Sequence, residues 1–298
     1  MNCRFCGNEL KHVFIDLGSA PPSNSYLNAD QLNRSESYYP LKVFVCSACF
    51  LVQVDEYKKA SEIFDNEYAY FSSYSTSWLA HAKAYTEKMI SRFGFNKNSL
   101  VIEIASNDGY LLQYFREKEI PVLGIEPTES TAKVAREKGI ESITEFFGED
   151  FAKKLTSVNR KADLLLGNNV LAHVPDINDF VEGLKVALKD KGVITMEFPH
   201  LVKLIENNQF DTIYHEHFSY LSFTTVNKIF ETHGLEMFDV EEIPTHGGSL
   251  RIYGKHKEDD SKSISENVKN LLAKEHEDGI SRLNYYKGFG EKVSEIKK

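Results

Sequence analysis

The sequence lacks the features that mark membrane, exported and nucleic-acid-binding proteins. It has no run of about 18 apolar residues, so we expect no membrane-spanning helix and no membrane partner. The first ten residues have neither a basic start nor an apolar stretch, which predicts a cytoplasmic protein without an export signal. The formal net charge of -9 argues against a nucleic-acid partner, because binding to phosphates needs a basic face. A small-molecule substrate fits this composition better.

Cysteine is also scarce, and the spacing of the few cysteines is informative. The four form two C-x-x-C pairs, Cys3 with Cys6 and Cys46 with Cys49. Without an export signal, paired cysteines favour a metal over a disulfide. Four thiolates suit zinc and leave no open coordination position, so we expect a structural Zn2+ ion in a loop-rich module over residues 1–60, beside the substrate entrance. The alternative is four incidental free thiols.

Helical periodicity follows the cysteine module. From Trp78 to Phe93 apolar residues recur at steps of three and four, which predicts an amphipathic helix that ends near Gly94. We expect residues 61–95 to form a helical connector and one wall of the substrate site.

Strand and helix patterns then alternate over residues 96–256. Such alternation is typical of an α/β, Rossmann-like core, in which helices cover both faces of a parallel sheet. The runs 236–243 and 249–256 could close that sheet as an antiparallel edge. Residues 257–298 show helical spacing that continues to the last residue without a cap, so we expect a helical extension and a chain that ends early.

A tight turn follows the first strand of this core. Asn107, Asp108 and Gly109 occupy it, and free backbone N–H groups at such a turn favour a nucleoside ligand. A dinucleotide-binding turn would carry G-x-G-x-x-G, and the single glycine here weakens a dehydrogenase interpretation. The second strand ends at Glu126, whose carboxylate can accept two hydrogen bonds from a ribose diol. A purely structural turn would account for these residues equally well.

The sequence YHEH at positions 214–217 places four ionisable residues after the fifth strand, where ligands meet such sheets. In a helix, Tyr214 and His217 would share a face, so that one could act as a base while the other donates a hydrogen bond. A metal site is an alternative, although H-E-H lacks the H-E-x-x-H spacing.

Several segments together resemble a known family. EIASNDGYLL, GIEP and NNVLAHVPD look like the S-adenosylmethionine site of class I methyltransferases, and in particular of sugar C-methyltransferases with an amino-terminal zinc module. DLGSAPPSNSYL, CSACFLVQ, YAYFSSYS, YHEHFSYLS and HGGSLRIY resemble segments of that family in the same order, so the match spans nearly the whole chain. The resemblance implies a carboxy-terminal Rossmann-like domain that would be almost absent here.

The resemblance also implies roles for individual residues. S-adenosylmethionine would contact Ala105, Ser106, Asn107, Gly109, Tyr110, Glu126, Pro127 and Asn168. Among these, Glu126 would bind the ribose hydroxyls and Asn168 would face the methionine end. Phe146 or Phe147 could pack near adenine or simply belong to the core, and His173 is expected to be a capping or core residue.

The same resemblance assigns the chemistry. His217 would be the general base, Glu216 its orienting or substrate-binding carboxylate, and Tyr214 would hold the sugar or its enolate, with Tyr68 assisting from the opposite wall. The expected substrate contacts are Tyr70, Ser73, His246 and Arg251.

The implied reaction moves a methyl group to a carbon, C-3, of a nucleotide-diphosphate-linked 4-keto-deoxysugar through an enolate. One alternative is O- or N-methylation of another small metabolite, which needs no enolate-forming base. Another is a non-catalytic S-adenosylmethionine-binding protein.

Overall fold

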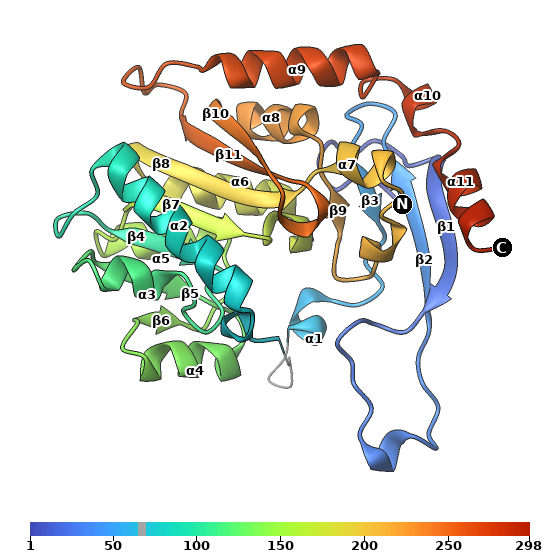
Figure 1. Ribbon diagram of the computed structural model, residues 1–298, viewed down its shortest axis with the longest axis horizontal. Coiled ribbons are helices and arrows are strands. Elements are labelled where there is room, and N and C mark those ends of the chain that lie inside the picture. The colour runs from blue at the N-terminus through green and yellow to red at the C-terminus, as the bar shows by residue number, and fades with distance from the viewer. Residues whose placement is uncertain (65–69) are drawn as a thin grey trace.

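The computed structural model describes residues 1–64 and 70–298. Its centre is a seven-stranded sheet in the order β10-β11-β8-β7-β4-β5-β6 (Figure 1). The strands of this sheet are β4 (Val101–Ile104), β5 (Val122–Ile125), β6 (Ser142–Ile143), β7 (Ala162–Asn168), β8 (Leu188–Pro199), β10 (Leu235–Ile243) and β11 (Ser249–His256). Strands β4 to β8 pair in parallel, and β11 pairs antiparallel with both β8 and β10. The predicted Rossmann-like sheet with an antiparallel edge is therefore confirmed.

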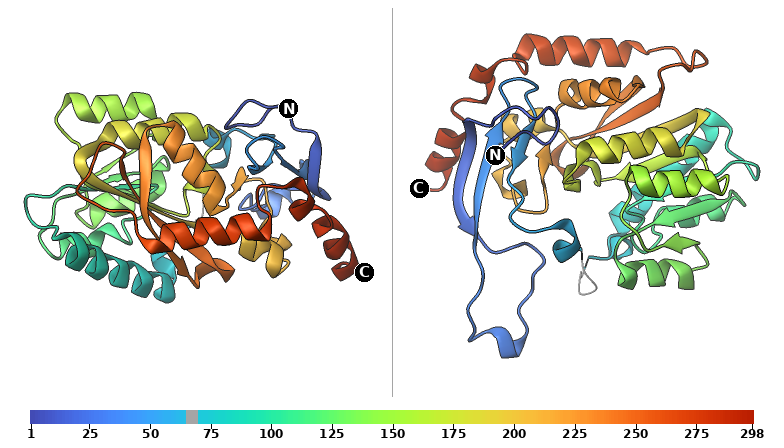
Figure 2. Two further views of the ribbon diagram at one scale, coloured as in Figure 1. Left: turned by 90° about the horizontal axis from the view of Figure 1, so that it is seen from above. Right: turned by 180° about the vertical axis from the view of Figure 1, so that it is seen from behind.

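Helices cover both faces of this sheet (Figure 1, Figure 2). One face packs against α2 (Thr76–Phe93), α3 (Leu112–Arg116) and α4 (Glu129–Glu137). The other packs against α5 (Glu149–Ser157), α6 (Ile177–Ala187) and α8 (Phe223–Thr232). The expected helix over 78–93 is α2, which begins where the Ser75 side chain accepts a hydrogen bond from the Trp78 backbone and ends at Gly94 with φ 71°.

The cysteine module is a sheet rather than the expected loop-rich knuckle. Strands β1 (His12–Ala20), β2 (Tyr39–Val45) and β3 (Val52–Val54) pair antiparallel, because their buried valine and isoleucine residues favour extended backbone. A fourth strand, β9 (Ser219–Tyr220), joins from far along the chain. The module is thus tied directly to the segment that follows the YHEH sequence.

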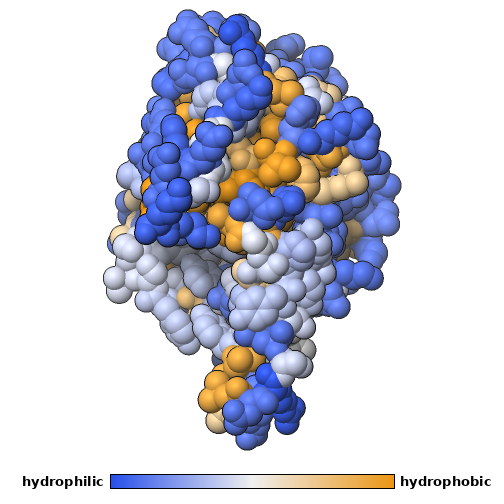
Figure 3. Space-filling view, turned by 90° about the vertical axis from the view of Figure 1, so that its right-hand side faces the viewer, coloured by the Kyte–Doolittle hydropathy of each residue, from blue (hydrophilic) through white to orange (hydrophobic). Residues whose placement is uncertain are grey.

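The loop between β1 and β2, residues 21–38, projects away from the body of the molecule (Figure 1). Apolar side chains gather at its tip (Figure 3), where Leu27 and Leu32 are exposed. The root of this loop, at Ser23 and Asn24, turns back toward the core.

The remaining helices are α1 (Ala60–Ile63), α7 (Leu201–Glu206), α9 (Glu266–Asp278), α10 (Leu283–Tyr286) and α11 (Phe289–Ile296). The last three confirm the helical extension. Helix α9 packs on β10 and α8 of the core. Helix α11 packs on the module, where the Phe289 ring stacks on Phe14 with centroids 4.7 Å apart. Among the residues that the structure describes, no helix is long and apolar enough to cross a membrane.

Candidate active site

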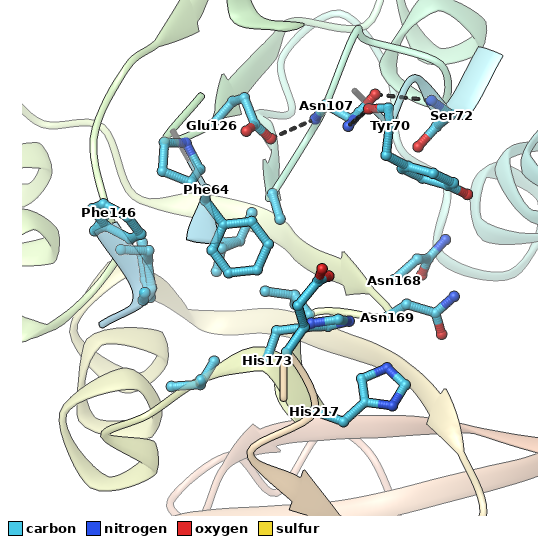
Figure 4. A pocket seen from close by; sticks show the side chains of 18 of the residues that line it. Phe64, Tyr70, Ser72, Asn107, Glu126, Phe146, Asn168, Asn169, His173 and His217 are labelled. Atoms are coloured by element: carbon cyan, nitrogen blue, oxygen red, sulfur yellow. Dashed lines mark hydrogen bonds between the residues drawn. The ribbon is translucent and has the colours of Figure 1, made fainter. Parts of the chain in front are cut away.

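A cavity of about 460 Å³ opens at the carboxyl ends of β4, β5 and β7 (Figure 4). This volume is typical of sites for small molecules. Core strands form one side of it. The turn at 211–217 and the module residues Asn24, Ala60 and Phe64 form another. The cavity therefore combines the strand ends of a Rossmann-like core with residues of the cysteine module.

The turn after β4 brings the backbone close to this cavity. Ala105, Asn107 and Gly109 all have positive φ, at 55°, 50° and 75°. A Cβ on Gly109 would lie 2.4 Å from Cδ1 of Ile140, so glycine is required there both by conformation and by space. Ala105 and Asn107 adopt the left-handed region without being glycine, so the turn takes this shape without the G-x-G-x-x-G pattern of dinucleotide-binding turns. Both of them line the cavity.

Glu126 lies at the end of β5, buried beside this turn. Its Oε2 accepts a hydrogen bond from the Asn107 backbone at 2.9 Å, and Oε1 accepts one from the Thr128 backbone at 2.9 Å (Figure 4). Burial raises the pKa of Glu126, and these donors oppose the rise. Each oxygen retains a second lone pair, and the residue lines the cavity. Such a carboxylate can accept hydrogen bonds from a ligand diol.

The Asn107 side chain forms hydrogen bonds with the backbone of the neighbouring segment at residues 70–72. Its Oδ1 accepts a hydrogen bond from the Ser72 backbone at 2.9 Å, and its Nδ2 donates to the Tyr70 carbonyl at 3.0 Å (Figure 4). Tyr70 lines the cavity, as predicted for a substrate contact, but Ser73 does not. The Ser73 hydroxyl accepts a hydrogen bond from Lys138 Nζ at 2.9 Å, and its expected substrate contact stays a prediction.

The predicted catalytic residue Tyr68 lies outside the described residues, so its catalytic role stays a prediction.

Asn168 is a buried amide at the end of β7. Neither its side-chain oxygen nor its nitrogen has a hydrogen-bond partner within the described part of the chain, yet it lines the cavity. An unpartnered buried amide is costly, so this side chain fits a polar ligand group such as the methionine end of S-adenosylmethionine.

The other predicted cofactor contacts divide into two groups. Tyr110 and Pro127 line the cavity, as do Phe146 and Phe147. Ser106 does not, because its hydroxyl is directed at β5, where a Cβ on Gly124 would lie 2.4 Å from it. The Ser106 side chain is thus turned away from the cavity, and its expected cofactor contact stays a prediction.

His217 is held in one tautomer at the opposite side of the cavity. Its Nδ1 lies 2.9 Å from the Thr212 carbonyl, which can only accept, so Nδ1 carries the proton. Its Nε2 lies 2.9 Å from the Tyr214 hydroxyl and accepts a hydrogen bond from it. Burial lowers the pKa of His217 to about 4, so the imidazole is neutral at neutral pH. The backbone here is a turn rather than a helix, closed by the His217 N–H and the Tyr214 carbonyl at 3.1 Å.

Glu216 points away from His217. Its Oε1 accepts hydrogen bonds from Ser23 Oγ at 2.8 Å and Asn24 Nδ2 at 2.9 Å. The Thr212 carbonyl, not Glu216, orients the imidazole of His217. Of the two expected roles for Glu216, the orienting role is corrected, while the substrate-binding role stays a prediction. His173 is half-buried, lines the cavity, and has its ring centroid 4.6 Å from that of His217.

His246 and Arg251 have different environments. His246 lines the cavity and meets Trp78 edge to face, with centroids 5.2 Å apart. Arg251 does not line it. The pairing of β11 with β8 places Arg251 opposite Glu197, and its Nε donates to Glu197 Oε1 at 2.6 Å inside the sheet. The expected contact between Arg251 and a sugar nucleotide is therefore corrected.

Several cavity residues were not predicted from the sequence. Trp78, which matched only a helix pattern, lines the cavity with its ring 5.9 Å from Tyr110. Asn24 and Asn169 also line it. Each comes from a different element, so no local pattern marks them as neighbours.

The four cysteines have the geometry of a zinc site. All four sulfurs lie within 4.8 Å of one another, with Cys3 and Cys49 at 3.5 Å and Cys6 and Cys46 at 3.5 Å. A tetrahedron of sulfurs about 2.3 Å from zinc has edges of about 3.8 Å, so the thiols fit this ion. Within residues 1–64 and 70–298 no other cluster of metal-ligating side chains is found, and the metal-site alternative at 214–217 gains no support.

Comparisons with known proteins match nearly the whole length of the chain. Family models described as "Putative zinc binding domain", "Methyltransferase domain" and "C-methyltransferase C-terminal domain" match residues 3–64, 78–240 and 244–298. C-methyltransferase NovU from Streptomyces niveus is 32% identical over 287 residues, which cover 96% of this chain and 68% of NovU. The crystal structure of the PH0226 protein from Pyrococcus horikoshii OT3 shares the fold, with a TM-score of 0.51, 15% identity, and coverage of 63% of this chain and 95% of that one.

Proposed function

The chain belongs to the family of C-methyltransferases that carry a zinc-binding domain, and from that premise we propose that it methylates C-3 of a nucleotide-diphosphate-linked 4-keto-deoxysugar. S-adenosylmethionine is its methyl donor, and zinc is its structural metal. The acceptor and the enolate route described below are the proposal.

The observation that carries the proposal is a neutral, tautomer-fixed imidazole in the cavity. A carbon next to a ketone has no lone pair, so a base must remove its proton before a methyl group can bond to it. Oxygen and nitrogen acceptors already have a lone pair. His217, with its unprotonated Nε2 beside the Tyr214 hydroxyl, supplies the base that carbon methylation needs.

The residues of the turn divide the proton chemistry among them. His217 Nε2 accepts the α proton of the ketone, and the resulting imidazolium keeps its Nδ1–H bond to the Thr212 carbonyl. The Tyr214 hydroxyl, released from Nε2, donates to the enolate oxygen. The electron pair left by the proton forms the new bond to the methyl carbon. When bound, S-adenosylmethionine supplies that methyl group as an electrophile.

The other side of the cavity positions the donor. Glu126 would accept hydrogen bonds from the ribose hydroxyls, and the turn at Ala105 and Asn107 would contact the methionine portion. Asn168 would gain the partner that it lacks. These residues would hold the methyl donor in the cavity that His217 also lines.

The test uses a panel of UDP-, dTDP- and GDP-linked 4-keto-6-deoxysugars with ¹³C-methyl S-adenosylmethionine. We expect a carbon–carbon bonded methyl group in the NMR spectrum of the product with at least one of them. The matched controls are the same nucleotide sugars with the 4-keto group reduced, which should not react. A methyl group on oxygen or nitrogen would replace the proposal with the first alternative, and cofactor binding without transfer to any acceptor would favour the non-catalytic one.

A further inference from the structure

Two residues of the zinc-binding module reach the Glu216 carboxylate. Ser23 Oγ and Asn24 Nδ2 donate to it at 2.8 and 2.9 Å across 193 and 192 residues of sequence. Both donors meet the same oxygen, Oε1. Oε2 has no hydrogen-bond partner among the residues that the structure describes, and Glu216 lines the cavity.

The backbone at this point is shaped for the contact. Asn24 has φ 56°, in the left-handed region that asparagine tolerates better than most residues. This conformation lies at the root of the 21–38 loop, and Asn24 itself lines the cavity. Ser23 and Asn24 are half-buried and contact Glu216, whereas the neighbouring Ser25 is exposed.

We propose that Ser23 and Asn24 are positioning residues, which keep Glu216 ionised and leave Oε2 as the acceptor for a hydroxyl group of the sugar. The proposal rests on the proposed function, since it concerns how the keto sugar is held. It also gives the zinc-binding module a part in substrate recognition. Two donors on one oxygen restrict rotation of the carboxylate, so the second oxygen has a defined direction.

The charges around Glu216 are consistent with this arrangement. Burial raises the pKa of Glu216, and the hydrogen bonds from Ser23 and Asn24 and the charge of Lys58 counteract the rise. The other titratable side chains of this turn are Asp211, Tyr214, His215 and His217, and His173 packs against His217. His215 Nε2 lies 3.2 Å from the Pro40 carbonyl. Burial lowers the pKa of His217 to about 4 and raises that of Glu216, so Glu216 changes charge before His217 as the pH falls from neutral.

The variants are Ser23→Ala, Asn24→Gly and the double variant, with Ser25→Ala as the control. Glycine removes the Asn24 amide without straining a backbone at positive φ. Loss of one hydrogen bond to a carboxylate raises the KM for the keto sugar nucleotide about tenfold. The acid limb of kcat/KM moves to higher pH, because Glu216 is protonated more readily, while the affinity for S-adenosylmethionine and the zinc content stay unchanged.

A further variant separates positioning from mere folding of the loop. Asn24→Asp keeps the size of the side chain and tolerates the left-handed backbone, but it places a second carboxylate against Glu216. Positioning predicts a higher KM for Asn24→Asp than for Asn24→Gly. A purely structural role of the loop predicts the reverse, and that result would overturn the inference.

The outcomes distinguish this inference from the proposed function. If the unmodified protein methylates a keto sugar nucleotide and the double variant matches Ser25→Ala in KM and pH profile, the inference alone fails. If the unmodified protein turns over no member of the panel, the proposed function and the inference fail together.

Discussion

Helix α9 is joined to the catalytic core through one buried carboxylate, Glu275. This side chain is fully buried, and its Oε1 lies 2.7 Å from His200 Nε2 and 2.9 Å from the Phe223 N–H. Oε2 accepts a hydrogen bond from the Thr224 N–H at 2.7 Å. The carboxylate therefore caps the start of α8 and contacts His200, which lies next to Pro199 at the edge of the cavity.

Substituting Glu275→Gln removes the charge and turns an N–H group toward backbone donors. Leaving the hydrogen-bond donors around this buried carboxylate without a charged acceptor costs roughly 3 kcal/mol. A chain of this size loses about 2 °C of melting temperature per kcal/mol, so we expect a decrease of about 6 °C. Burial alone would raise the pKa of Glu275, but the hydrogen bonds from His200 and Thr224 outweigh it and hold the pKa below the usual 4.5.

The pH dependence follows from that direction. A carboxylate with a lowered pKa contributes stability that is present above the unfolded value of about 4.5 and is lost as the pH falls through the folded value. Thermal unfolding at pH 7 and at pH 4 tests this, with the exposed Glu277→Gln as the matched control. The difference between the Glu275→Gln and unmodified proteins should be large at pH 7 and smaller at pH 4. Equal melting temperatures for Glu275→Gln and Glu277→Gln at pH 7 would refute the reasoning.

Three further predictions concern the metal and the cofactor. Metal analysis should find one zinc per chain and none in Cys46→Ser, which should also melt at lower temperature; unchanged zinc content in that variant would contradict the four-cysteine site. Trp78 is the only tryptophan and lines the cavity, so its fluorescence should report S-adenosylmethionine binding. Glu126→Ala should weaken the affinity for S-adenosylmethionine about tenfold or more. An unchanged Kd in that variant would remove Glu126 from the cofactor site. Gly109→Ala should lose cofactor binding and about 2 kcal/mol of stability through left-handed strain and a clash with Ile140, whereas normal binding would contradict the tight turn.

Much of the core could be predicted because buried parallel strands read as apolar runs. Val122–Ile125 is such a run, and Val101–Ile104 is one that is interrupted only by Glu103. The residues after these strands, including Glu126, fall at the ligand edge of the sheet. Strand β6 was not predicted, since its two residues are too few to show a pattern. The cysteine pairs were informative for a similar reason, because metal ligation depends on residue type and local spacing.

Side chains whose roles depend on distant partners were harder to predict. Arg251 next to a glycine-rich turn resembles a ligand contact, and only the register of β11 against β8 reveals Glu197 opposite it. Ser23 and Asn24 contact Glu216 although nearly 200 residues of sequence separate them from it. A local sequence pattern carries no information about such a distant contact. Tyr214 and His217 would share a face if their segment were helical, but the segment is a turn. They still meet there, because the side-chain contact needs only a tight reversal of the chain.

The central claim is that His217 removes a proton from carbon, and solvent exchange tests it most directly. The keto sugar nucleotide that accepts a methyl group is incubated with the protein in D2O and S-adenosylhomocysteine, which fills the donor site but has no methyl group to transfer. The unmodified protein should introduce deuterium at C-3, and His217→Gln should not, although both should bind the cofactor equally. Exchange by His217→Gln at the unmodified rate would contradict the assignment of His217 as the base.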